Sequence, residues 1–133
     1  MRKTKGKVLA AVLVASVLCA GTVTAQAETI SRSIGGYGFT ATTEVTSTTA
    51  MARTLAGGPY LYVSVSAEYN YINLDTYETA REYGDDQGIM GARVDFTTDS
   101  DYRYRTIDVK ASHTAEAENG EFWSGSTDES YIQ

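Results

Sequence analysis

The feature that most constrains the fold is an alternation of apolar and polar side chains from Tyr60 to Ile72, the longest in the chain. Successive side chains of a β-strand point to opposite faces, so this pattern predicts a strand with one buried and one solvated face. The buried face is expected to carry Leu61, Val63, Val65, Ala67, Tyr69 and Tyr71. The solvated face is expected to carry Tyr60, Tyr62, Ser64, Ser66, Glu68 and Asn70.

The first 27 residues have the pattern of a secretory signal peptide. A basic segment is followed by an apolar run from Val8 to Ala20, and Ala25-Gln26-Ala27 has the small-residue spacing of a cleavage site. The apolar run is shorter than the roughly 20 residues of a membrane-spanning helix, which disfavours an uncleaved anchor. We therefore expect a Sec signal cleaved after Ala27 and a secreted protein without a stable membrane anchor. The basic residues are Arg2, Lys3, Lys5 and Lys7.

Residues 28–133, after the predicted cleavage, have the length of one domain and contain no cysteine. Cys19, the only cysteine, lies within the predicted signal. It is preceded by Leu18, and Ser16 stands three positions before it, which is not the pattern of a lipoprotein signal. An exported chain without disulfides and with a long basic leader favours a Gram-positive bacterium as its source.

Cleavage would also change the charge of the protein. Four of the 11 basic residues belong to the predicted signal and all 17 acidic residues lie after it, so the mature net charge is 7 − 17 = −10. Nucleic acids and anionic lipids are bound through clustered Lys and Arg. The charge therefore argues against both partners, and an acidic surface is typical of soluble proteins.

The chain before the long alternation predicts two strands. Residues 28–36 are expected to be a loose lead-in. Residues 37–45 alternate with their apolar side chains at odd positions, and residues 47–55 are expected to return antiparallel. Ala56-Gly57-Gly58-Pro59 predicts the turn into the strand that starts at Tyr60.

Two more strands are predicted after residue 88, over residues 89–98 and 102–117. In the first, the side chains expected to face inward are Met90, Ala92, Val94 and Phe96. In the second, those expected to face inward are Ile107, Val109, Ala111, His113 and Ala115. Those expected to face outward are Tyr104, Thr106, Asp108, Lys110 and Thr114.

The strongest hairpin signal is Asn119-Gly120, because a type I′ turn needs positive φ at both of its central residues. Such a turn would set Glu116 opposite Trp123, so that Trp123 faces outward from a last strand over residues 121–127.

Residues 73–88 carry conflicting signals. Asp75 and Glu78 have the spacing of a helix cap, whereas Tyr77, Arg81 and Tyr83 alternate as a hairpin arm would. We expect a long polar connection there, with one helical turn.

These segments give about six to seven strands at short spacing, without the βαβ rhythm of a parallel sheet. The predicted fold is all-β, with one small antiparallel β-sandwich or partly open barrel over residues 28–133.

Few residues suit catalysis or metal binding. His113 is the only histidine and lies on a predicted inward face, which disfavours both a His/Cys zinc site and a Ser-His-Asp triad. Asp85-Asp86 and the pair Asp99 and Asp101 lie in predicted loops but do not match an EF-hand. We expect no enzyme, no metal and no cofactor, and calcium binding by these loop acids stays an alternative.

Tyrosine is abundant, with ten in 133 residues, and several tyrosines lie on predicted outward faces. Exposed aromatic rings stack on sugars or form protein interfaces. A register shift of one residue would bury the same rings in the core instead. The candidate ligand-binding residues are Tyr60, Tyr62, Tyr102, Tyr104 and Trp123.

The hypothesis that these patterns favour is a secreted non-catalytic module that recognises a cell-surface glycan or protein through a tyrosine-rich sheet face. One alternative is a small secreted antagonistic or signalling protein. Gly35-Gly36-Tyr37-Gly38 and the Ser/Tyr-rich β pattern resemble the lactococcin-972-type bacteriocins over these few residues, which would imply such a role. A second alternative is an extracellular protein that self-assembles through strand edges. The sequence leaves the oligomeric state open.

Overall fold

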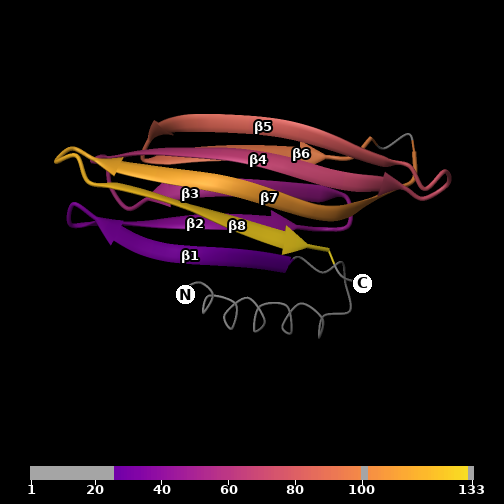
Figure 1. The fold of residues 1–133 in the computed structure, drawn as a ribbon, viewed down its shortest axis with the longest axis horizontal. Helices are drawn as coiled ribbons and strands as arrows, with labels where there is room; N and C mark the ends of the chain where they lie inside the picture. Colours follow the sequence, from indigo (N-terminus) through magenta and orange to yellow (C-terminus); the bar gives the residue numbers. More distant parts are fainter. Residues whose placement is uncertain (1–25, 100–101, 132–133) are drawn as a thin grey trace.

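The computed structural model describes residues 26–99 and 102–131, which form eight antiparallel strands and no helix. The strands build two four-stranded sheets, in the orders β1-β2-β3-β6 and β5-β4-β7-β8, packed face to face as a β-sandwich (Figure 1). The predicted all-β fold is confirmed, with eight strands instead of six or seven. The strands are β1 (Gln26–Ile34), β2 (Tyr37–Val45), β3 (Thr49–Ala56), β4 (Leu61–Asn73), β5 (Thr79–Ile89), β6 (Gly91–Thr97), β7 (Tyr104–Ala117) and β8 (Phe122–Ser130).

The long alternation predicted around Tyr60 to Ile72 becomes β4, in the interior of the second sheet between β5 and β7. Its predicted inward side chains are all buried, and Val63 and Tyr69 are fully so. Burying such side chains is the main stabilising contribution to a fold of this kind. The core between the sheets is completed by Phe39, Val45, Ala52, Phe96, Val109 and Ala115.

A histidine bridges the two sheets inside this core. The hydroxyl of Thr54 on β3 donates to the carbonyl oxygen of Ser64 (2.8 Å), so its lone pair must accept from Nδ1–H of His113 (2.8 Å). Nε2 of His113 then carries no hydrogen and accepts from the hydroxyl of Thr127 on β8 (2.8 Å). Burial lowers the pKa of His113 to about 4, so the imidazole is neutral. The predicted inward position of His113 is confirmed.

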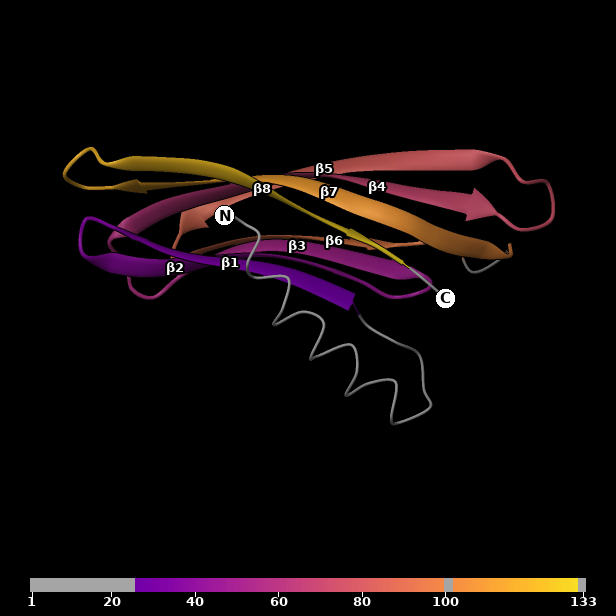
Figure 2. The same ribbon diagram turned by 60° about the horizontal axis from the view of Figure 1, so that its bottom comes forward.

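The two sheets also meet along their edges. On one side, the chain passes from β5 directly into β6 through Met90 (Figure 1). On the other side, Glu28 of β1 accepts a hydrogen bond from the backbone N–H of Asp128 on β8 (2.8 Å). Figure 2 separates the two layers and shows β1 and β8 along the same side of the sandwich.

The predicted loose lead-in over residues 28–36 is wrong, because β1 pairs with β2 from Gln26 to Ile34. Its inner face buries Gln26, Glu28 and Ile30. Two of these three are polar, which hides the strand from a hydrophobicity pattern. Residues 1–25 of the predicted signal peptide lie outside the described residues, and Gln26 and Ala27 belong to β1.

The predicted long connection over residues 73–88 is also wrong, and so is its helical turn. The side chain of Asn73 accepts hydrogen bonds from the N–H groups of Asp75 (2.8 Å) and Thr76 (3.2 Å), which closes a tight turn. β5 then pairs with β4 along its whole length. Its inner face includes Gly84, where an added Cβ would lie 2.5 Å from Val94. There is no room for a side chain at this position, so the inner face of β5 has no apolar residue there.

The predicted inward position of Met90 is also wrong, because the residue is 48% exposed rather than buried. It forms the corner between the sheets with φ 78°, donates its N–H to the carbonyl oxygen of Leu61 (3.2 Å) and accepts from the N–H of Ala56 (2.7 Å). Because Met90 turns the chain sharply between β5 and β6, its side chain does not follow the inward–outward alternation of either strand.

Candidate binding face

The outer face of the sheet β5-β4-β7-β8 carries short hydroxyl side chains at adjacent positions of three strands. Ser66 on β4 lies opposite Ser112 on β7, which in turn lies opposite Ser126 on β8. The alternation of β4 sends its branched apolar residues inward and leaves the outer face to these small polar ones. The neighbouring row repeats the pattern with Ser64, Thr114 and Ser124.

The shortness of these side chains leaves a hollow on the face. We refer to it as the serine hollow; its volume is about 580 Å³. This is within the usual range of ligand sites in proteins. Its floor is formed by Ser66, Ser112 and Ser126, and the longer side chains around it are Tyr83, Glu68, Lys110, Asp128 and Glu28.

Tyr83 gives the serine hollow a flat apolar wall. It lies on β5 opposite Glu68 of β4 and is 68% exposed. The guanidinium of Arg81 donates to its hydroxyl oxygen (3.2 Å) and so restricts where the ring lies. An exposed ring beside a floor of hydroxyl groups offers one stacking surface and several hydrogen-bonding groups in a single site.

The charges next to Tyr83 form a connected network. Arg81 pairs with Glu68 (3.5 Å) and donates to the side-chain oxygen of Asn70 (3.1 Å). The amide nitrogen of Asn70 donates to Glu68 (2.9 Å) and to Asp108 (2.7 Å). The hydrogen bond to Tyr83, with the charge of Glu68, raises the pKa of Arg81, which therefore stays cationic.

The charge around the serine hollow is predominantly negative. Glu28, Glu68 and Asp128 contribute three carboxylates, against the ammonium group of Lys110 and the guanidinium of Arg81 that pairs with Glu68. Such an environment disfavours phosphate, sulfate or carboxylate groups and accepts neutral or amine-bearing ligands.

Two of the predicted site residues lie at one end of the sandwich, away from the serine hollow. Tyr62 is 43% exposed on the same outer face. It lies six residues before Glu68 on β4, which corresponds to roughly 20 Å along the strand. Tyr60 is exposed just before β4, and its ring lies 5.0 Å from that of Tyr37 on β2.

The predicted outward position of Tyr104 is wrong. The register of β4 against β7 shifts between Asn70 and Tyr71, so that Ile107 is an additional residue in β7 and its alternation reverses there. Thr106 is therefore buried, while Ile107 is exposed, the opposite of the prediction for both. Tyr104 packs on the core with its ring 5.2 Å from that of Tyr71.

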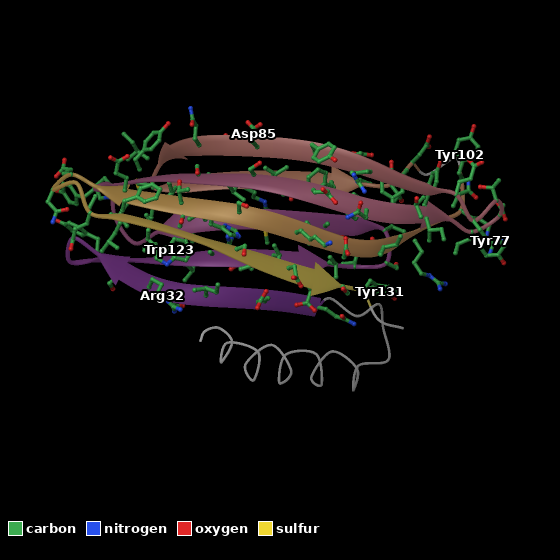
Figure 3. All side chains as sticks on the ribbon, in the orientation of Figure 1. Arg32, Tyr77, Asp85, Tyr102, Trp123 and Tyr131 are labelled. Atoms are coloured by element: carbon green, nitrogen blue, oxygen red, sulfur yellow. The ribbon has the colours of Figure 1, made fainter. Side chains whose placement is uncertain are left out.

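Tyr102, just before β7, is exposed at the same end as Tyr104. Figure 3 shows Tyr102 and Tyr77 together at this end, opposite the end formed by the β7–β8 hairpin. The loops that carry them are joined where Arg103 donates to Asp75 (2.9 Å). Tyr102 is therefore separated from Tyr60 and Tyr62 by the length of the sandwich.

The predicted outward position of Trp123 is also wrong. Of the two predicted turn residues, only Gly120 has positive φ (91°). The backbone of Ala117 bonds with both Gly120 and Glu121, so the loop has three residues instead of two. The longer loop pairs Trp123 with Ala115 of β7 instead of Glu116, and the side chain of Trp123 therefore faces inward. Its ring packs on Phe39 of the other sheet at 4.9 Å, in the region labelled in Figure 3.

The five predicted residues therefore do not lie together on one surface, and the sequence did not predict the serine hollow. Ser66 was placed on the outer face, but its neighbours Ser112 and Ser126 depend on the pairing of distant strands. Tyr83 was detectable from its alternation with Arg81, which was outweighed by the turn and cap signals around it.

The serine hollow has no histidine that would activate a serine as a nucleophile. His113 lies on the opposite face of the sheet, and both of its ring nitrogens are engaged by threonines. Within residues 26–99 and 102–131, no three His, Cys, Asp or Glu side chains are grouped to hold a metal ion. The same residues include no helix long and apolar enough to cross a membrane.

A second, smaller hollow of about 250 Å³ lies on the outer face of the other sheet, over β3 and β6. Its most prominent charges already pair with each other, because the guanidinium of Arg93 makes hydrogen bonds of 2.9 to 3.1 Å to Asp95. The serine hollow is the larger of the two and has more free hydroxyl groups, so it is the stronger candidate site.

No family model matches this chain, and searches of curated proteins and of solved structures also found no match. Its function is therefore inferred from its own residues.

Proposed function

We propose that this protein is a secreted, non-catalytic module that binds a neutral or amine-bearing glycan in the serine hollow. The observation that carries the proposal is the serine floor of Ser66, Ser112 and Ser126 beside the exposed ring of Tyr83. Sugars present hydroxyl groups around their edge and C–H groups on their faces, which suits hydrogen-bonding side chains next to an aromatic ring.

The carboxylates around the hollow support the choice of glycan class. Glu28, Glu68 and Asp128 outnumber the cations Lys110 and Arg81, and Arg81 is already paired with Glu68, so anionic polymers are disfavoured. A neutral polysaccharide is accepted without a charge penalty, and an amino sugar gains from the carboxylates. The expected setting is outside a bacterial cell, which the basic leader and the apolar run before Ala25-Gln26-Ala27 support.

The proposal is tested by titrating the protein with neutral, amine-bearing and acidic oligosaccharides and measuring heat release by calorimetry. We expect binding to the first two classes only. Tyr83→Ala should weaken it by about tenfold or more, because stacking by one ring contributes roughly 1–2 kcal/mol.

Tyr77→Ala is the matched control, since Tyr77 is equally exposed but lies on the β4–β5 loop. Its affinity should equal that of the unchanged protein. Absence of binding across all three glycan classes, or equal loss in both variants, would refute the proposal.

A further inference from the structure

The surface around the β5–β6 corner is unusually apolar. Eleven large apolar or aromatic side chains are exposed among the described residues. Seven of them belong to strand ends and turns next to this corner or the β7–β8 hairpin, which lie at the same end of the sandwich (Figure 1). We call these seven the corner patch: Tyr37, Leu55, Tyr60, Tyr62, Ile89, Met90 and Phe122.

The pairing of the strands makes the centre of the corner patch continuous across both sheets. Ile89 on β5 lies opposite Tyr62 on β4, and Met90 follows it at the corner. On the other sheet, Leu55 lies opposite Gly91, which has no side chain to separate it from Met90. Ile89 is the most exposed of these, at 64%.

The size of the corner patch is that of an interface. Its side chains are about half exposed, and side chains of this size present roughly 150–250 Å² each, so the continuous centre of Tyr62, Ile89, Met90 and Leu55 exposes roughly 400 Å² and all seven side chains roughly 700 Å². Soluble monomers rarely expose a continuous apolar surface of more than a few hundred Å². A stable dimer buries about 800 Å² on each partner.

The charges on the two sides of the corner patch have opposite signs. On the side of β7, Glu116 lies between Tyr62 and Phe122. On the other sheet, the row next to Leu55 carries Arg53, whose Nε is buried without a hydrogen-bond partner. Arg53 forms no ion pair with any other described residue.

A second copy of the chain matches this arrangement. We propose that the protein forms a twofold symmetric dimer through the corner patch. A twofold axis in the plane of contact, between the two charged sides, puts Glu116 of each copy beside Arg53 of the other. The apolar centre supplies the stabilisation and the two charge pairs fix the orientation. The floor of the serine hollow begins at Ser66, four residues or roughly 13 Å from Tyr62 along β4 and outside the corner patch, so this proposal is independent of the glycan proposal.

The test is analytical ultracentrifugation of the purified protein from micromolar to millimolar concentration. We expect a mass that rises to twice that of the chain. Ile89→Asp should raise the dissociation constant by about tenfold or more, because it places a carboxylate in the apolar centre. Ile107→Asp is the matched control, since Ile107 is exposed at the opposite end, and it should leave the dimer unchanged.

A charge exchange tests the orientation. Glu116→Arg and Arg53→Glu should each weaken the dimer, and the double variant should recover most of the affinity. Circular dichroism checks that each variant is folded. A monomer at all concentrations, a dimer unaffected by Ile89→Asp, or a double variant no better than the single ones would overturn the proposal. So would a monomer that binds phosphatidylcholine vesicles, which would assign the patch to a lipid surface.

Discussion

The two faces of the sheet β5-β4-β7-β8 are built by the same strands and differ in almost every physical property. On the inner face of β4, Val63, Val65 and Tyr69 are at most 1% exposed. On the outer face, Ser66 and its neighbours on β7 and β8 leave a hollow open to solvent. The difference indicates that the inner face determines stability, whereas the outer face can be adapted to a ligand at little cost to the fold.

The largest expected effect is on the inner face. Val63→Asp should destabilise the protein by about 5 kcal/mol and abolish folding, because it buries an unpaired carboxylate. Ser66→Asn, three residues away on the outer face, adds no charge opposite Asp85 and should change the free energy of unfolding by less than about 0.5 kcal/mol. Urea denaturation followed by circular dichroism measures both. A stable, folded Val63→Asp protein would show that the assignment of faces is wrong.

Lowering the pH should reduce the free energy of unfolding through His113, which is buried on the inner face. The unfolded chain, with a histidine pKa near 6.5, takes up the proton before the folded chain, whose pKa is about 4, so lowering the pH favours unfolding. The loss over this interval should approach about 3 kcal/mol. Urea midpoints measured between about pH 7 and pH 4.5 should fall steadily. An NMR titration of His113 with an ordinary midpoint would contradict this expectation.

A buried hydroxyl pair should show a smaller effect. The phenol of Tyr69 lies 2.7 Å from the hydroxyl of Thr106, and both side chains are buried. Tyr69→Phe should cost about 1–2 kcal/mol, because Thr106 loses its partner inside the core. Tyr62→Phe, on the outer face, is the matched control and should be nearly neutral. Equal effects of the two changes in thermal unfolding would remove the contrast between the faces.

The smallest expected effect concerns the ion pair beside the serine hollow. Glu68→Gln breaks the pairing with Arg81, whose side chain is more than half exposed, and should change stability by less than about 0.5 kcal/mol. Its effect on ligands should be larger than its effect on the fold, because it removes one of three carboxylates. Differential scanning calorimetry and oligosaccharide titration of one sample separate the two effects.

The sequence was sufficient to predict a strand and its buried face where one face of the strand is strongly apolar. The alternations that start at Tyr37 and Leu61 predicted β2 and β4 with the correct faces, because burial of every second side chain leaves a pattern of period two. β1 and β5 were missed because their inner faces lack a regular series of apolar side chains. On the inner face of β1, the buried carboxylate of Glu28 is satisfied by a hydrogen bond from the backbone N–H of Asp128. On the inner face of β5, Gly84 leaves no side chain to bury.

The positions of individual aromatic residues were less predictable. One additional residue, Ile107, reversed the expected orientation of Tyr104. One additional residue in the hairpin loop, next to Gly120, did the same for Trp123. A shift of a single residue moves every following side chain to the other face, and its energetic cost depends on contacts that are distant in sequence.

The sequence by itself determined that this protein is all-β and antiparallel, a sandwich or partly open barrel with the strand that starts near Tyr60 packed on the core, because regular alternation specifies a strand and the face that it buries. Only the tertiary structure decided where a ligand or a second copy would bind. Ser66, Ser112 and Ser126 lie up to 60 positions apart in the chain, and only the pairing of β4, β7 and β8 makes them one surface. The corner patch likewise exists because the chain crosses from one sheet to the other at Met90.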